Sequence, residues 1–177
     1  MKTFQELLRE LNACQDARMW ARGKTIDEVV EECHRGDWLL WLARKVDIGL
    51  KPLTLTKGLC ANTVRHLMKG EQSMKAVDVA IAFGEGKATL DELNNAAAYA
   101  DAAYDAAYDA YDAAYDAASA ANAYAAGAAA GAAAYAAAAY AYADAAARTQ
   151  NQKQTADICR EHIGQLIIDK VNELLKN

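Results

Sequence analysis

The chain has 177 residues, of which 24 are acidic and 19 basic, and its net charge is −5. This length suffices for one ordinary domain with a buried core, and a single proline with ten glycines excludes a collagen or a proline-rich linker. No run of about 18 bulky apolar residues suggests a transmembrane helix, and the polar first residues do not resemble a signal peptide. The negative charge disfavours nucleic acid as the main partner. Taken together, these features predict a cytoplasmic helical domain that binds neither nucleic acid nor membrane.

Three capping boxes predict where helices begin. In each, a threonine is followed three residues later by a glutamate, so that the hydroxyl and the carboxylate each accept from the other residue's backbone N–H. The boxes start at Thr3, Thr25 and Thr89. With apolar residues at helical spacing and glycines as stops, we expect helices over 4–20, 26–36, 37–46, 53–68, 73–83 and 153–175. The side of the last helix that faces the core should carry Ile158, His162, Leu166, Val171 and Leu174.

A low-complexity block of alanine, tyrosine and aspartate occupies residues 96–147. It contains all nine tyrosines of the chain and no lysine or arginine, so its charge is −6 and the remainder of the chain sums to +1. Alanine favours helix most strongly, and one straight helix of this length would extend about 78 Å. That length predicts a bend, for which Gly127 and Gly131 are the weakest points. We expect two antiparallel helices, with a single long helix as the alternative.

Within this block, aspartates and tyrosines recur every three or four residues and form two neighbouring stripes on a helix. One interpretation is structural: tyrosine fills the groove that alanine leaves, and aspartate keeps the outer face soluble. The other is a partner-binding surface, since tyrosine anchors interfaces and an acidic stripe attracts a basic partner. The residues of this candidate surface are Tyr104, Asp105, Tyr108, Asp109, Tyr111, Asp112, Tyr115 and Asp116.

The four cysteines, at positions 14, 33, 60 and 159, show no zinc-type spacing. We expect free thiols, with Cys14 and Cys33 as small apolar residues on buried helix faces. The chain contains no recognisable catalytic motif, so we expect no enzyme, no cofactor and no metal site.

The most distinctive short run is RGDWLLWL, at residues 35–42. Asp37 is suited to cap a helix start, and Trp38 and Trp41, three residues apart, can bury a large area together. In the structural interpretation, Asp37 caps the helix and the two tryptophans anchor it in the core. In the functional interpretation, this segment forms the wall of a pocket, with Arg35 and Asp37 at its rim. The candidate pocket residues are Arg35, Asp37, Trp38, Trp41, Arg65 and His66.

Four segments of the sequence resemble a known family of helical proteins. They are CHRGDWLLWLA at residues 33–43, the segments around 60–68 and 76–80, and QTADICREHI at residues 154–163. Together with the alanine- and tyrosine-rich block, they resemble the Imm5-like immunity-protein family. This resemblance implies a small helical protein that binds and neutralises a toxin by covering its active site, without catalytic residues or cofactor.

The sequence therefore predicts an all-α single domain over residues 1–177, a helical bundle in three parts. These are short helices over 1–95, the alanine-rich helix or hairpin over 96–147, and a C-terminal helix over 150–177. The first functional hypothesis is an immunity or inhibitor protein that binds a toxin or effector through the acidic surface. The alternative is a phage or bacterial defence protein that sequesters a small nucleotide-like signal, with Arg35 or Arg65 meeting a phosphate. Self-association through the alanine face stays open.

Overall fold

The computed structural model describes residues 2–68, 71–106 and 145–176, with side chains described up to residue 98 and again from residue 149. These residues form α-helices and one short 3₁₀ helix and contain no strand, which confirms the all-α prediction. None of the helices described is both long and apolar enough to span a membrane. The elements in chain order are α1 (Phe4–Glu10), α2 (Gln15–Trp20), α3 (Ile26–Glu32), α4 (Gly36–Lys45), α5 (Leu50–Asn62), η1 (Arg65–Leu67), α6 (Glu71–Gly84), α7 (Leu90–Ala106) and α10 (Ala145–Lys176).

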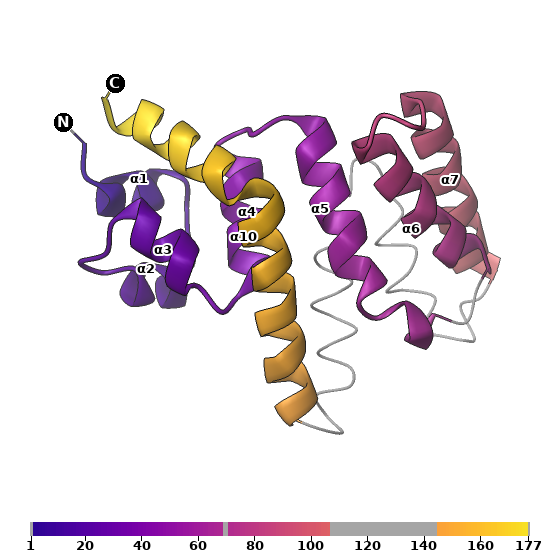
Figure 1. Ribbon diagram of the computed structural model, residues 1–177, viewed down its shortest axis with the longest axis horizontal. Helices are drawn as coiled ribbons and strands as arrows, with labels where there is room; N and C mark the ends of the chain where they lie inside the picture. The colour runs from indigo at the N-terminus through magenta and orange to yellow at the C-terminus, as the bar shows by residue number, and fades with distance from the viewer. Residues whose placement is uncertain (1, 69–70, 107–144, 177) are drawn as a thin grey trace.

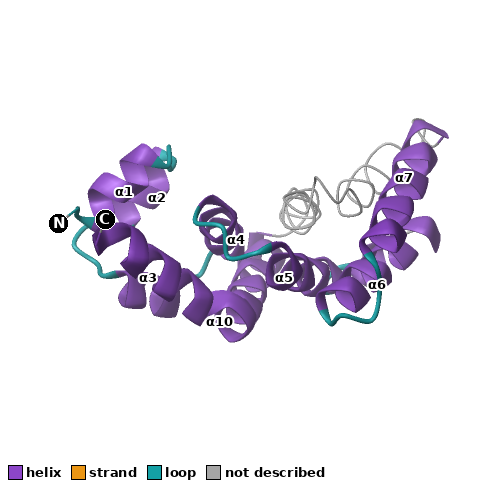
Figure 2. Cartoon of the chain, turned by 90° about the horizontal axis from the view of Figure 1, so that it is seen from above, coloured by secondary structure: helices purple, strands orange, loops and turns teal. Residues whose placement is uncertain are grey.

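The long helix α10 is the organising element of the fold. It has 32 residues and packs along α3, α4 and α5, and it also touches α1 near the chain termini (Figure 1). Beyond α5, the helices α6 and α7 follow in sequence order, each packed on the one before. Viewed from above, the helices form an arc that runs from α1–α3 to α7 (Figure 2). The last helix of the chain thus packs against α1, α3, α4 and α5, and α2 packs against α1.

The main hydrophobic core lies between α10 and the first five helices. Apolar side chains at helical spacing on each element converge there, which is the usual way in which amphipathic helices become stable. Between α5, α6 and α7 the apolar contacts form smaller clusters of alanine, valine, phenylalanine and leucine. The most deeply buried members of the main core include Leu39, Leu40, Ala43, Cys60, Ile163, Ile167 and Val171.

The three predicted capping boxes are all present. Thr3 and Thr25 accept from the N3 amides of α1 and α3, and Glu6 and Glu28 accept in return from the threonine N–H groups. Glu92 Oε2 accepts from the Thr89 N–H at 2.7 Å. Hydrogen bonds from the backbone N–H and the hydroxyl of the capping threonine lower the pKa of the glutamate in each box. These helix starts are therefore local properties of the sequence.

The single helix expected over residues 4–20 is wrong, because the chain breaks after Glu10. Asn12 adopts the left-handed conformation with φ 61°, and the N–H of Ala13 donates to Leu8 O at 2.9 Å. This is a Schellman motif, which ends a helix with one residue in the left-handed conformation. Glycine usually occupies that position, and here it is asparagine. The break separates α1 from α2 and turns Cys14 outward, so the expectation of a buried Cys14 is also wrong.

The inward face of α10 also differs from the predicted one. His162 and Leu166 are exposed, whereas Cys159, Ile163, Ile167 and Val171 are fully buried. The buried set repeats every four residues, so it forms one stripe that turns slowly around a long helix. The prediction mixed this stripe with its neighbour. It was correct for Val171, which is buried, and for Ile158 and Leu174, which are partly buried against the main core. All four cysteines are free thiols, as expected, and Cys33 is buried as predicted.

Candidate functional site: a tryptophan cluster at the α2–α4 end

Two tryptophans and three cationic or imidazole side chains meet where α2, α3 and α4 come together. The rings of Trp20 and Trp38 lie 6.0 Å apart, and the His34 ring stands edge-on to Trp20 at 6.1 Å. Lys24 Nζ lies 5.0 Å above the Trp20 ring, and Arg35 Cζ lies 4.7 Å above the Trp38 ring. We call Trp20, Lys24, His34, Arg35 and Trp38 the tryptophan cluster. It combines large apolar rings with positive charge at partly exposed positions.

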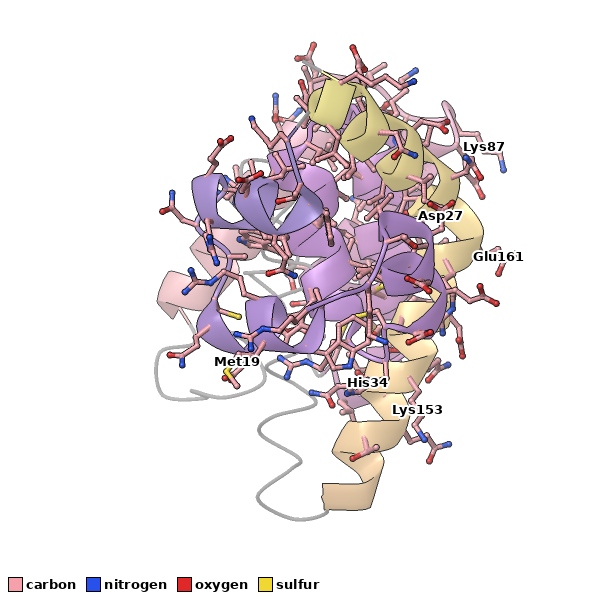
Figure 3. All side chains as sticks on the ribbon, turned by 90° about the vertical axis from the view of Figure 1, so that its left-hand side faces the viewer. Met19, Asp27, His34, Lys87, Lys153 and Glu161 are labelled. Carbon is pink, nitrogen blue, oxygen red and sulfur yellow. The ribbon has the colours of Figure 1, made fainter. Side chains whose placement is uncertain are left out.

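The two tryptophans have one side in the core and the other toward solvent. Both pack against the main core while remaining partly exposed. Met19, the residue before Trp20, is 58 % exposed, and His34 is exposed as well. Figure 3, which faces this end of the molecule, shows the side chains of Met19 and His34 in its lower half, above the first turns of α10. The cluster is therefore a partly exposed aromatic surface whose inner side packs against the main core.

Arg35 is held in place by Asp37. Arg35 Nε donates to Asp37 Oδ1 at 2.8 Å and Nη2 donates to Oδ2 at 2.6 Å, a two-pronged ion pair. These hydrogen bonds raise the pKa of Arg35, so its charge is permanent. The predicted cap role of Asp37 is wrong, because Arg35 occupies the N-cap position of α4 and Asp37 binds its side chain instead. The pair fixes the guanidinium over the Trp38 ring.

Helix α10 holds the loop that carries His34 and Arg35. Arg160 Nη1 donates to the carbonyl of Cys33 at 2.7 Å, at the end of α3. A Cβ on Gly36 would lie 2.5 Å from Thr155 Oγ1, so only glycine allows α4 to approach α10 this closely. The run at 33–43 and the run at 154–163 thus pack against each other. The two most distinctive segments of the sequence build this loop.

The other predicted pocket residues lie in separate contacts. Trp41 packs against the main core with Lys45 Nζ 5.9 Å from its ring. Arg65, in η1, forms a two-pronged ion pair with Asp78 of α6, at 2.5 and 2.8 Å. His66 is adjacent to it in η1. The structure brings Arg35, Asp37 and Trp38 together and gives Arg65 a different partner on another helix.

The predicted acidic surface lies mostly outside the described residues. Tyr104 and Asp105 belong to the last turn of α7, where the structure describes the backbone alone. Tyr108, Asp109, Tyr111, Asp112, Tyr115 and Asp116 fall outside the described residues, as do the predicted bends at Gly127 and Gly131. The acidic surface stays a prediction.

Sequence reasoning missed two further features. One is an arginine-lined hollow between α1 and α2 with a volume of about 460 Å³. The other is Lys57, which is 2 % exposed and whose Nζ has no hydrogen-bond partner among the residues that the structure describes. Burial, with a contribution from the charge of Arg44, lowers the pKa of Lys57 to about 7. The spacing of Leu53, Lys57 and Cys60 on one helix face was the signal that could have placed the lysine in the core.

The described residues bring together no group of three or more His, Cys, Asp or Glu side chains suited to hold a metal ion. No family model, no curated protein and no solved structure matches this chain. The resemblance to the immunity-protein family accordingly stays a prediction from the sequence. The case for function depends on the geometry of the surface.

Proposed function

We propose that this protein acts by binding another protein, and that the tryptophan cluster is part of the contact surface. The supporting observation is the pair of partly exposed tryptophans with cations over their rings, anchored in the core by α4 and α10. Tryptophan and arginine are enriched among the residues that contribute most to binding at protein interfaces. A tryptophan buries a large area and has only two side-chain torsions to order. A preformed aromatic surface loses little entropy on binding.

In its finer form, the proposal follows the family resemblance: the partner is a toxin or effector, and binding covers its active site. The acidic stripe of tyrosines and aspartates would then supply a second contact and attract a basic partner. A nuclease toxin fits this charge, because a phosphate-binding active site is basic.

The small-ligand alternative receives less support at its predicted residues. It placed a phosphate against Arg35 or Arg65, and both guanidiniums are already engaged by the carboxylates of Asp37 and Asp78. A phosphate at either position has to displace a two-pronged carboxylate. The geometry therefore favours protein binding at this end of the molecule.

The test begins with native mass spectrometry of the tagged protein recovered from its host cells. An added mass of many kilodaltons identifies the partner, and the complex is then rebuilt from purified components. Because Met19 and His34 are exposed, Met19→Ala with His34→Ala should preserve the fold and weaken binding by about fivefold or more. Unchanged affinity in this variant would contradict the proposal that the exposed side of the tryptophan cluster, with Met19 beside it, contacts the partner.

The acidic stripe needs a separate variant. Changing Asp105, Asp109 and Asp112 to lysine should weaken the complex and reduce its dependence on salt. A matched control makes the same charge change at exposed positions on α3 and α10, with Glu31, Glu161 and Asp169 each replaced by lysine. If both variants bind equally well, the stripe has no role.

Growth arrest by the partner alone, relieved by co-expression of this protein, is the expected outcome for a toxin.

A further inference from the structure

The hollow between α1 and α2 is lined by three arginines from different parts of the chain. Arg9 lies in the last turn of α1, Arg18 in the last turn of α2, and Arg22 follows the end of α2. Gln5, Gln15 and Met19 complete the lining. The helix break at Asn12 folds α2 back beside α1, and Gln5 Nε2 donates to Ala21 O at 2.9 Å, which fixes the two helices together. The folded hairpin therefore places three positive charges around one space.

None of these three arginines forms an ion pair with a carboxylate of the described residues. By contrast, Arg35, Arg65 and Arg160 each form an ion pair, with Asp37, Asp78 and Asp157 respectively. The Nε of Arg18 is buried and has no hydrogen-bond partner in the described part of the chain. Glu6 is close enough for Arg9 to contribute to the lowering of its pKa, but its carboxylate is engaged by Thr3. A buried donor without an acceptor is costly unless a ligand supplies one.

Helix ends explain only part of this arrangement. A cation in the last turn of a helix is stabilised by the helix dipole, which accounts for Arg9 and Arg18 along their own helices. It does not account for three guanidiniums around a common hollow, since like charges repel. An anion there would remove the repulsion and accept the unused N–H groups. The volume of about 460 Å³ lies in the range of small-molecule sites and exceeds what one phosphate group fills.

We propose that this hollow binds the phosphate groups of a small ligand, with Arg9, Arg18 and Arg22 as the charged contacts. The guanidinium fork matches phosphate oxygens in pairs, and three forks exceed what a single carboxylate can use. The hollow borders the proposed protein-binding surface at Met19. None of its three arginines belongs to the tryptophan cluster, so the arginine variants test this proposal separately.

The test uses inorganic pyrophosphate as the probe. We expect saturable one-to-one binding by isothermal titration calorimetry, at an ionic strength held constant with sodium chloride. Replacing Arg9, Arg18 and Arg22 together by glutamine should weaken binding by about tenfold or more. The single change Arg18→Lys retains the charge and loses the fork, so it should weaken binding by a smaller factor.

A matched control removes the same three charges elsewhere. Lys51, Lys153 and Lys176 are exposed, and their replacement by glutamine should leave pyrophosphate affinity within about twofold. Circular dichroism verifies that each variant is folded. Absence of saturable binding by the unchanged protein overturns the proposal. An equal loss of affinity in the control overturns it as well, because the attraction would then be general electrostatics.

Discussion

Two regions of this protein are held together in opposite ways. In the first, α1–α4 with α10, bulky aliphatic side chains fill one core. In the second, α5–α7, the helices approach so closely that small residues form the contacts. A Cβ on Gly84 would lie 2.3 Å from Leu55 Cβ, and one on Gly58 would lie 2.9 Å from Ile81 Cγ1. The first region depends mainly on the volume of its side chains, with one close approach at Gly36, whereas the second has smaller apolar clusters and close approaches at both Gly58 and Gly84.

Helix α5 belongs to both regions, and it carries the least favourable residue of the core. Leu53 and Cys60 are members of the main core, while Gly58 faces α6. Lys57 lies on the same face as Leu53 and Cys60. An amine buried there without a partner is destabilising when charged, which is why its pKa is lowered. The first test is therefore made on α5, the helix that the two regions share.

The largest expected effect is at Lys57. The unfolded chain keeps the lysine proton up to about pH 10.5, while the folded state loses it near pH 7. The unfolded state thus binds more protons in this window, so the free energy of unfolding should rise with pH. The difference in pKa corresponds to at most about 5 kcal/mol. Lys57→Met should be more stable at pH 7 and lose this pH dependence, as measured by urea unfolding at several pH values.

A control for this prediction lies on the same helix. Lys51 is exposed, so Lys51→Met should retain the rise of stability between pH 7 and pH 10. A flat pH profile in the unchanged protein would show that the amine finds a charged partner or water in solution.

The next largest effect is expected in the aliphatic core. Ile163 is 1 % exposed on α10, and Ile163→Ala removes most of its side chain from the main core. We expect a loss of about 3 kcal/mol, the usual size for a buried isoleucine. Ile163→Val should lose about 1 kcal/mol. Thermal and urea unfolding measure both. A loss below 1 kcal/mol for the alanine variant would contradict a core that depends on volume.

A smaller effect, caused by added volume, is expected in the second region. Gly84→Ala places a methyl group against the backbone of Leu55 and should cost about 2 kcal/mol. Gly164→Ala is the comparison in the first region, where the nearest side-chain atom is Val30 Cγ1 at 3.1 Å. Because that side chain can move, we expect a cost well below that of Gly84→Ala. Equal costs would mean that the two regions do not differ in this way.

Local patterns in the sequence predicted local structure well. The boxes at Thr3, Thr25 and Thr89 give helix starts because each needs only the side chains and amides of one turn. The predicted start at Leu53 is three residues late, since Pro52 sits inside the first turn of α5, where its missing N–H costs nothing. The helix break was missed at Asn12, where apolar spacing continued across the turn.

The candidate sites were predicted less well than the helices. Arg35, Asp37 and Trp38 do meet, because they are neighbours in sequence. Trp20 was not foreseen in that cluster, because its approach to Trp38 requires α2 and α4 to be placed side by side. Arg9 converges with Arg18 and Arg22 only because the chain reverses between them.

The sequence by itself determined that this protein is helical, where three of its helices begin, and that its cysteines are free thiols. These properties depend on hydrogen bonds and spacings within a few residues. The tertiary structure decided which face of α10 is buried, that Lys57 is enclosed, and that the arginines of α1 and α2 share a hollow. Those outcomes depend on contacts between different helices, some adjacent in the chain, as α1 and α2 are, and others far apart, as Gly36 against Thr155. Helical periodicity contains no information about such contacts.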